Sequence, residues 1–355
     1  MKKLVLATVI SAGILSFSVS AGDKVTSSLK DFYSANGAIT TVDNYPRFET
    51  ARQMVKNQDI AGINKLRHKR VLTPTDEQPV VRMNRDTFYS FATVDVSESA
   101  YITMPKIPKG KYMSVEVITE DHRIQPMVYG EGTFNLTTHT GEHVALVIRL
   151  DATFTKEEVR KYQDQMKITA KSNTPFTTEH VNKESFHKVE KSLKAKMPGI
   201  LKAGGAEATF GMFTAPTDSS KELFIQERYA VGAAIGWGGA QLVDNVYEVS
   251  GNYPMQQCHQ MTFEDPQNKA FWSVTVYNKQ GFMFGKFANV NSKTAKVNKD
   301  GTYTVSFGCG KDAINNIPTN NLSGVFNLAM RHYIPSDKVR IDGYRLIPLV
   351  KAVDL

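Results

Sequence analysis

Residues 80–150 alternate apolar and polar side chains in twos, and this period restricts the segment to β-strands, because successive side chains of a strand point to opposite faces. In residues 112–118, for example, Met113, Val115 and Val117 alternate with a more polar set. Prolines and glycines divide the segment into short strands. We predict a β domain over residues 22–151, with short helices over residues 24–34 and 48–56 at its start and a final hairpin whose turn contains Thr140 and Gly141.

The middle of the chain, residues 152–240, has the pattern of a helical connecting region. Thr155 followed by Glu158 is a capping box, which opens a charged helix that we expect to continue to about residue 168. A second helix is predicted over about residues 183–196, because Pro198 and Gly199 can end it.

A third helix is predicted to begin near Ser219, where Glu222 follows three residues later. The stretch 203–211 is rich in glycine and alanine, so we interpret it as a linker.

Strand patterns return in residues 241–355. Asp300-Gly301 is typical of a hairpin turn. Five short segments are rich in β-branched and aromatic residues and are predicted strands: 255–263, 271–278, 303–308, 326–333 and 340–347. The predicted fold class is therefore mainly β with helices, an α+β multidomain protein in which two β-sandwich or jelly-roll-like domains are bridged by a helical segment.

Residues 1–21 have the features of a cleavable signal peptide, with Lys2 and Lys3 before an apolar stretch and small residues up to Ala21. Cleavage is expected before Gly22. The apolar run is shorter than the roughly 20 residues that a membrane-spanning helix needs. We predict a periplasmic or secreted protein without stable membrane insertion after cleavage.

The composition, 41% hydrophobic and 22% charged, is that of a globular protein and excludes a disordered chain. The formal net charge of +8 is compatible with anionic partners such as phosphorylated sugars or acidic glycans, although a basic surface without a special role is the favoured explanation. We expect no nucleic-acid partner. The oligomeric state is left open.

The chain has two cysteines, Cys258 and Cys309. In an oxidising compartment the two can form a disulfide, whereas two separate buried thiols are the alternative. The sequence leaves both alternatives open.

Several separated motifs carry a resemblance to two families. Residues 64–70 (NKLRHKR) and 80–90 (VVRMNRDTFYS) resemble domain of unknown function 1254, DUF1254. Residues 271–277 (FWSVTVY), 298–301 (NKDG) and 326–335 resemble its usual C-terminal companion, DUF1214. The resemblance implies two β-rich domains with intervening helices and often an export signal, and it implies no established chemistry.

One element departs from the pattern of the companion family. Where that family typically has Asn-Trp-Leu-Pro, this chain has Asn315-Asn316-Ile317-Pro318. Because the tryptophan is missing, the resemblance does not imply a stacking role for an aromatic side chain at this position.

The densest polar cluster comprises Arg82, Asn84, Arg85, Asp86 and Tyr89. Arginine offers bidentate hydrogen bonds and tyrosine a stacking face, so we predict that these side chains line a ligand site. The alternative is a turn in which Asn84 and Asp86 satisfy backbone amides and an arginine pairs with Asp86.

Glu116 completes the predicted ligand site, and it also raises an enzymatic alternative. Asp86 or Glu116 could act as general acid or base, with Arg85 stabilising developing negative charge. Glycoside hydrolysis would need two carboxylates about 5 to 9.5 Å apart across a cleft, and the sequence does not give this distance. The catalytic residues, and whether the protein is an enzyme at all, are left open.

His139, Glu142 and His143 match an inverted zinc-protease pattern that requires a helix. Thr140-Gly141 instead indicates a turn, so we predict no metal site and no cofactor.

The leading hypothesis is an envelope protein that binds a small polar ligand, anionic or carbohydrate-like, in a pocket between the domains. One alternative is a hydrolase or lyase that acts on a glycan or ester. The other is a secreted interaction protein, which would present a large apolar patch.

Overall fold

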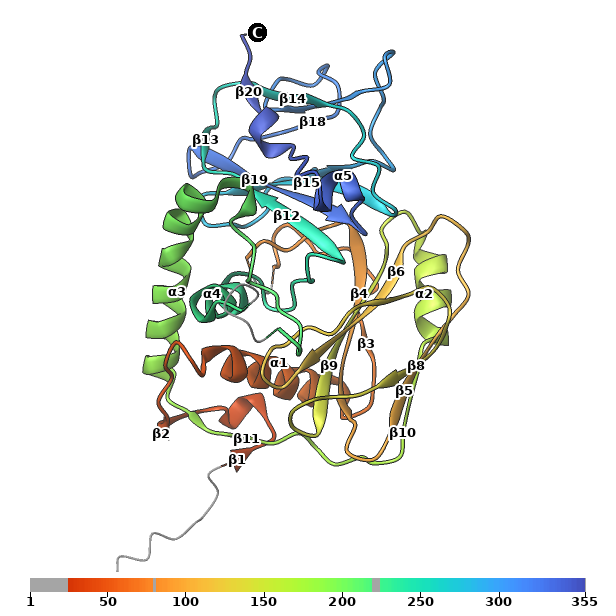
Figure 1. Cartoon of the computed structure of the whole chain (residues 1–355), viewed down its shortest axis with the longest axis vertical. Helices are drawn as coiled ribbons and strands as arrows, with labels where there is room; N and C mark the ends of the chain where they lie inside the picture. Colours follow the sequence, from red (N-terminus) through yellow and green to blue (C-terminus); the bar gives the residue numbers. More distant parts are fainter. Residues whose placement is uncertain (1–24, 79–80, 219–223, 355) are drawn as a thin grey trace, which may run out of the picture.

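The computed structural model describes residues 25–78, 81–218 and 224–354, which form two β units and a group of helices (Figure 1). The C-terminal β unit lies at the top of Figure 1, above the N-terminal β unit and the helices. The predicted signal peptide (residues 1–21) and the predicted helix start near Ser219 lie outside the described residues. No helix in the described residues is long and apolar enough to cross a membrane.

The N-terminal unit is built on an antiparallel five-stranded sheet. Its strand order is β3 (Arg67–His68), β4 (Thr87–Asp95), β9 (His143–Asp151), β6 (Met113–Thr119) and β7 (Val128–Tyr129). Strands β4, β9 and β6 are buried along most of their length because both faces of the sheet are covered.

One face is covered by a three-stranded sheet of β10 (Lys167–Ala170), β5 (Ala100–Met104) and β8 (Gly132–Leu136), together with α2 (Lys156–Gln165). The predicted capping box at the start of α2 is confirmed. Apolar side chains that alternate along the strands form the core between these layers, including Phe88, Val94, Ile102, Leu146, Ile148 and Phe154.

The other face is covered by α1 (Tyr45–Ala61), α3 (Lys183–Gly204) and α4 (Gln226–Gly236). The predicted helix around residues 48–56 is thus confirmed as part of α1, which has a proline in its first turn and ends at Gly62 with φ 87°. The core beneath the three helices includes Phe48, Met54, Ala145, Val147, Phe186 and Val231.

Short elements complete this unit. β1 (Val25–Thr26) pairs with β11 (Thr178–Glu179), and β2 (Tyr33–Ala38) follows a 3-10 helix at Leu29–Asp31. A second 3-10 helix, Gly205–Glu207, follows α3.

The C-terminal unit contains a sheet of β12 (Asn245–Val249), β19 (Val325–Tyr333), β15 (Phe271–Asn278) and β16 (Asn289–Asn291), with β13 (Tyr253–Pro254) also paired to β19. Trp272, Val274 and Val276 point to one face of β15 and enter the core of this unit. The alternate residues of β15 point to the N-terminal unit, so this sheet also has both faces covered.

The second sheet of this unit has the order β18 (Asn316–Ile317), β17 (Tyr303–Phe307), β14 (His259–Phe263) and β20 (Lys351–Ala352). A short helix, α5 (Asp337–Arg340), and a 3-10 helix, Ile347–Leu349, connect the two sheets. Met261, Phe307, Leu328 and Leu346 pack with Trp272 between the sheets.

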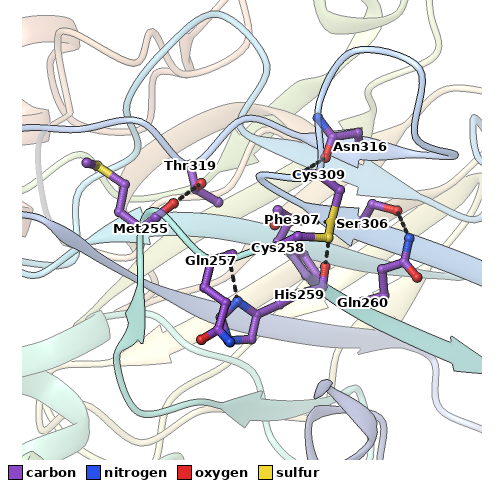
Figure 2. Close-up of a disulfide and its surroundings, with 10 residues drawn as sticks. All are labelled: Met255, Gln257, Cys258, His259, Gln260, Ser306, Phe307, Cys309, Asn316 and Thr319. Atoms are coloured by element: carbon purple, nitrogen blue, oxygen red, sulfur yellow. Dashed lines mark hydrogen bonds between the residues drawn. A yellow bond between two sulfur atoms is a disulfide. The ribbon is translucent and has the colours of Figure 1, made fainter. Parts of the chain in front are cut away.

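Cys258 and Cys309 form a disulfide, which resolves the two alternatives that the sequence left open (Figure 2). The bridge joins the start of β14 to the residue after Gly308 at the end of β17, with 4.6 Å between the two Cα atoms. Asn316 accepts a hydrogen bond from the backbone N–H of Cys309 at 3.0 Å. The disulfide therefore links the two central strands of the second sheet at one end.

The mainly β, multidomain fold class with helices is confirmed, with two packed sheets in each β unit; a jelly roll is not confirmed. The turn at Asp300-Gly301 is confirmed, since the N–H of Gly301 donates to Asn298 O at 3.0 Å.

Other predicted elements were wrong. Strands β8 and β9 do not pair with each other but belong to different sheets, so the hairpin predicted around residues 139–142 is a connection between layers. Residues 340–347 form no strand, because they run from the last residue of α5 to the first residue of a 3-10 helix. In place of the helix predicted over residues 24–34, residues 25–34 form β1, a 3-10 helix and the start of β2, and Lys24 lies outside the described residues. The expected linker 203–211 begins inside α3.

Helix α3 continues through Pro198, where the sequence predicted its end. Phe186, Leu193, Met197 and Ile200 lie on one buried face of α3. Packing of this face outweighs the cost of an internal proline, about 3 kcal/mol.

Candidate functional site

The two β units meet where strands β15 and β19 turn their outer face to the start of β4. Ser273, Thr275 and Tyr277 on β15, with Arg331 and Tyr333 on β19, point to this interface, and all five are buried. Polar side chains on a buried sheet face must find partners within the protein.

Asp86 is the acceptor at the centre of this interface, with 1% of its surface exposed. Its Oδ2 accepts hydrogen bonds from Ser273 Oγ at 2.6 Å and Tyr333 Oη at 3.1 Å, and its Oδ1 accepts one from Asn289 Nδ2 at 2.8 Å. All three donors belong to the C-terminal unit, so Asp86 joins the two units.

The turn before β4 has the geometry expected for the alternative to a ligand site, in which Asn84 satisfies a backbone amide. Asn84 Oδ1 accepts a hydrogen bond from the N–H of Asp86 at 3.0 Å, and Asn84 Nδ2 donates to Tyr89 Oη at 2.7 Å. Arg85 donates to the carbonyl of Thr73 at 2.5 Å, so it does not pair with Asp86.

Arg82 points into a second group of interface contacts. Its guanidinium donates to Asn327 Oδ1 at 3.1 Å, and its carbonyl accepts from Arg331 Nη2 at 2.8 Å. Arg331 also donates to Tyr277 Oη and Thr275 Oγ1, at 2.9 and 3.1 Å.

Glu116 lies in a separate network on the N-terminal sheet. Its Oε2 accepts a hydrogen bond from Arg149 Nη1 at 2.8 Å, and both side chains are buried. Burial raises the pKa of Glu116 to about 7, although the Arg149 guanidinium acts in the opposite direction. Glu116 Oε1 has no hydrogen-bond partner among the residues that the structure describes.

The six residues predicted from the sequence therefore lie close to the domain interface but do not face one cavity. Asp86, Asn84 and Tyr89 share one network, Arg82 and Glu116 belong to two others, and their partners are internal. The two cavities described below are lined by other residues. The role of the six predicted residues in ligand binding stays a prediction.

A cavity of about 140 Å³ lies between α1, α3 and α4, and we call it the helix cavity. Tyr45, Glu49 and Arg52 lie at spacings of four and three residues on one face of α1 and point to it. Glu190 and Lys194 of α3 lie on a second side. The remaining lining residues are Ala233, Ala234, Gly236 and Trp237 at the end of α4, Val81 before β4, and Phe282 after β15.

Two loops from the different β units close one end of the helix cavity. The N–H of Arg82 donates to Gly281 O at 2.8 Å. Gln78 Nε2 donates to Met283 O, and Gln78 Oε1 accepts from Met283 N, at 3.0 and 2.9 Å. Val81 and Phe282 thus come together although 201 positions separate them in the sequence.

The carboxylates of the helix cavity are already paired. Glu49 accepts two hydrogen bonds from Arg52, each at 2.7 Å, and one from Gln53 at 2.8 Å. Glu190 accepts from Lys194 at 2.7 Å and contacts His187 Nδ1 at 3.1 Å. The acceptors of this site are therefore occupied.

Several donors of the helix cavity remain free. Among the described residues, neither the hydroxyl of Tyr45 nor Nη1 of Arg52 has a hydrogen-bond partner, and Lys194 Nζ uses one of its three hydrogens. Tyr45 is only 1% exposed. Burial and the nearby carboxylates of Glu49 and Glu190 raise the pKa of Tyr45 far above its usual value, so its hydroxyl stays a neutral donor.

A second, more open hollow of about 390 Å³ lies at the edge of β5 and β8. Hydroxyl and carboxylate side chains line much of it, among them Ser97, Glu98, Thr137 and Glu142, with Tyr101 beside them. These side chains are largely exposed, and the hollow lies away from the interface of the β units.

His139 and His143 are the two histidines of the sequence pattern for which we predicted no metal site. His139 Nε2 contacts Asp121 at 3.0 Å, whereas His143 Nε2 contacts the carbonyl of Thr174 at 2.8 Å. The two imidazoles thus have different partners. Within residues 25–354, apart from the two undescribed gaps, no three His, Cys, Asp or Glu side chains are arranged to hold a metal ion.

Sequence reasoning missed Tyr45, Glu49, Arg52 and Trp237. The apolar positions that predict the helix over residues 48–56, Phe48, Ala51, Met54 and Val55, do not include these residues. One signal was available: Glu49 and Arg52 lie three positions apart, the spacing of an ion pair on one face of a helix.

Comparisons with protein families confirm the resemblance seen in the sequence. Residues 63–142 match the model of DUF1254, and residues 248–337 match the model of DUF1214; both are described as proteins of unknown function. The two segments occur in the predicted order. The comparison with curated proteins found no match.

Two solved structures of similar proteins were also found. The VPA0106 protein from Vibrio parahaemolyticus has a TM-score of 0.63 and 17% sequence identity, over 88% of this chain and 98% of that one. An uncharacterized protein from Burkholderia cenocepacia has a TM-score of 0.49 and 12% identity, over 87% of this chain and 86% of that one. The likeness to VPA0106 shows a shared fold.

Proposed function

For a chain that combines these two family segments, we propose that the helix cavity binds a small anionic molecule, such as a carboxylate. The single observation that carries this proposal is the imbalance of free groups in the cavity. The carboxylates of Glu49 and Glu190 are paired, whereas Tyr45, Arg52 and Lys194 retain unused donors. A ligand that accepts hydrogen bonds and carries negative charge satisfies these donors.

The walls of the helix cavity favour a small organic ion. Ala233, Ala234 and Gly236 leave space at the end of α4, and the rings of Trp237 and Phe282 supply apolar surface. The volume of about 140 Å³ is below that of sites for drug-sized ligands.

The position of the cavity supports a role for both β units in binding. Val81 belongs to the N-terminal unit and Phe282 to the C-terminal unit, so a bound ion would contact both units and the helices. Ligand sites commonly form between domains.

We place this activity in the periplasm or outside the cell. The features of residues 1–21 support export. The disulfide supports it too, because such bonds persist mainly in oxidising compartments.

No observation favours the hydrolase alternative. The carboxylates of Asp86 and Glu116 have their partners in different networks, and neither residue lines the helix cavity.

Isothermal titration calorimetry with acetate, benzoate, inorganic phosphate and glucose tests the proposal. The protein is recovered from the envelope fraction of expressing cells, where mass spectrometry should find Gly22 at its N-terminus. At least one of the anions should bind and glucose should not. Tyr45→Phe removes only the free hydroxyl and should weaken binding by roughly three- to tenfold, the contribution of one hydrogen bond.

Arg52→Gln should weaken anion binding further, because it removes a charged donor. Arg47→Gln is the matched control: Arg47 also lies on α1 but pairs with Glu179 at the surface, so this variant should bind as the wild type does. The proposal fails if no anion binds, or if Tyr45→Phe and Arg52→Gln both keep the wild-type affinity.

A further inference from the structure

Trp237 forms part of the lining of the helix cavity, and we call this part the Trp237 wall. Three hydrogen bonds fix the position of Trp237 and the residue after it. Trp237 Nε1 donates to Thr50 Oγ1 of α1 at 2.9 Å. The next residue, Gly238, donates its N–H to His122 Nε2 at 3.2 Å, and its carbonyl accepts from Arg149 Nη2 at 3.0 Å. Trp237 is therefore connected through Gly238 to the N-terminal sheet.

Gly238 has little freedom to change its position. Its φ is 72°, which glycine adopts readily and other residues rarely do. A Cβ atom at this position would lie 3.1 Å from Ile118 Cδ1 on the sheet. Contacts with the sheet thus help to fix the point at which α4 ends and the Trp237 wall begins.

Arg149 connects this wall to a carboxylate. One of its terminal nitrogens donates to Gly238 O and the other to Glu116 Oε2. Both side chains are buried, and the guanidinium carbon lies 5.8 Å from the centre of the Tyr89 ring. The charge of Glu116 is therefore the counter-charge that orients Arg149.

We propose that Arg149 positions the Trp237 wall of the helix cavity, and that the charge of Glu116 thereby controls the affinity for the anion. This inference rests on the function proposed above. It assigns Arg149 and Glu116 as positioning residues, since neither lines the cavity.

The surroundings of Glu116 offer no substitute for its charge. The other ionisable groups near the pair are Tyr112 before β6, Tyr89 on β4, Tyr247 on β12 and Asp244 before β12. Burial raises the pKa of Tyr112 and of Tyr247, so both hydroxyls stay neutral. Asp244 is held by Tyr129 Oη at 2.7 Å and by the N–H of Met127 at 3.2 Å, whereas Arg149 donates to Glu116 and Gly238. When Glu116 takes up a proton, Arg149 becomes a buried cation without its partner.

Such a cation is stabilised by moving toward other acceptors or water, which loosens its hold on Gly238. The affinity for the anion should therefore be higher when Glu116 is ionised. Because burial raises the pKa of Glu116 to about 7, the change falls near neutral pH.

Fluorescence of Trp237 reports on the wall without any ligand. The chain has two tryptophans, so Trp272→Phe leaves Trp237 as the sole reporter. Between about pH 5.5 and about pH 8.5 its emission should change with a midpoint near the pKa of Glu116. Glu116→Gln should abolish this transition. Persistence of the transition in Glu116→Gln, or its absence in the parent protein, overturns the inference.

Binding of benzoate provides the second readout, because benzoate stays ionised throughout this pH range. The affinity of the wild type should fall by roughly fivefold or more from about pH 8.5 to about pH 5.5, whereas that of Glu116→Gln should be low at both. Arg149→Lys keeps the charge but shortens the reach to Gly238, so it should lower the affinity at both pH values.

His187→Gln is the control for the histidine that contacts Glu190 on the other side of the cavity, and it should keep the pH dependence. If benzoate and the other anions fail to bind at either pH, the proposed function is wrong. If they bind with an affinity that does not depend on Glu116, the function stands and the inference is wrong.

Discussion

His122 is a buried imidazole at a strained backbone position, since its φ is 62° and it is completely inaccessible to solvent. Its Nε2 accepts from Gly238, and its Nδ1 has no partner in the described part of the chain. Burial lowers the pKa of His122 to about 3. His122 is thus a neutral acceptor behind the Trp237 wall.

This burial predicts a pH dependence of stability. Below about pH 6.5 the imidazole of His122 binds a proton in the unfolded chain, whereas in the folded protein it does so only near pH 3. Between these two pH values, the free energy of unfolding therefore decreases by about 1.4 kcal/mol for each unit by which the pH is lowered. His122→Asn, which tolerates a positive φ, should remove this contribution. Urea denaturation at several pH values measures it.

The pH dependence of the unfolding free energy must be compared between the wild type and His122→Asn, because other groups titrate in the same pH window. The raised pKa of Glu116 acts in the opposite sense and adds stability as the pH falls from about 7. His68, whose pKa burial lowers to about 4, is present in both proteins. Parallel pH profiles for the wild type and His122→Asn would contradict the assignment.

At the scale of elements, the disulfide closes a loop between strands β14 and β17, and its cysteines have a sequence separation of 51. The double variant Cys258→Ser/Cys309→Ser should lose about 2 to 4 kcal/mol of unfolding free energy, because the unfolded chain gains freedom. Chemical denaturation with and without reductant measures the loss.

The double variant itself should not respond to reductant, which makes it the control for effects of the reductant alone. Two titratable thiols in the unfolded, unreduced wild type would show that the bond does not form.

Elements were predicted well where a local signal decided them. The capping box at Thr155 and the β-branched and aromatic residues of 271–278 predicted elements that the structure contains. The end of α3 was predicted wrongly because the burial of Met197 and Ile200, which no local pattern reveals, carries the helix past Pro198.

At the scale of the whole molecule, Asp86 holds the two β units together through Ser273, Asn289 and Tyr333. Asp86→Asn replaces an acceptor with a donor opposite three donors, so it should cost about 2 to 4 kcal/mol of unfolding free energy. Chemical denaturation measures this cost.

The anion affinity of folded Asp86→Asn should stay close to that of the wild type, because Asp86 does not line the helix cavity. Asp342→Asn, at an exposed aspartate, should change neither quantity. Loss of anion binding in Asp86→Asn with unchanged stability would restore Asp86 as a ligand-binding residue.

The sequence by itself determined the β-rich fold class, most of the central strands, the helix at Thr155 and the two family segments, because periodicity, capping and motifs are local properties of the chain. It also located the polar cluster at Arg82–Tyr89. The tertiary structure alone decided that the partners of this cluster come from residues about 200 positions away, and that Tyr45, Arg52, Lys194 and Trp237 surround one cavity. The physical reason is that hydrogen-bond partners and cavity walls depend on which distant faces pack together, and the order of residues does not specify this without the fold.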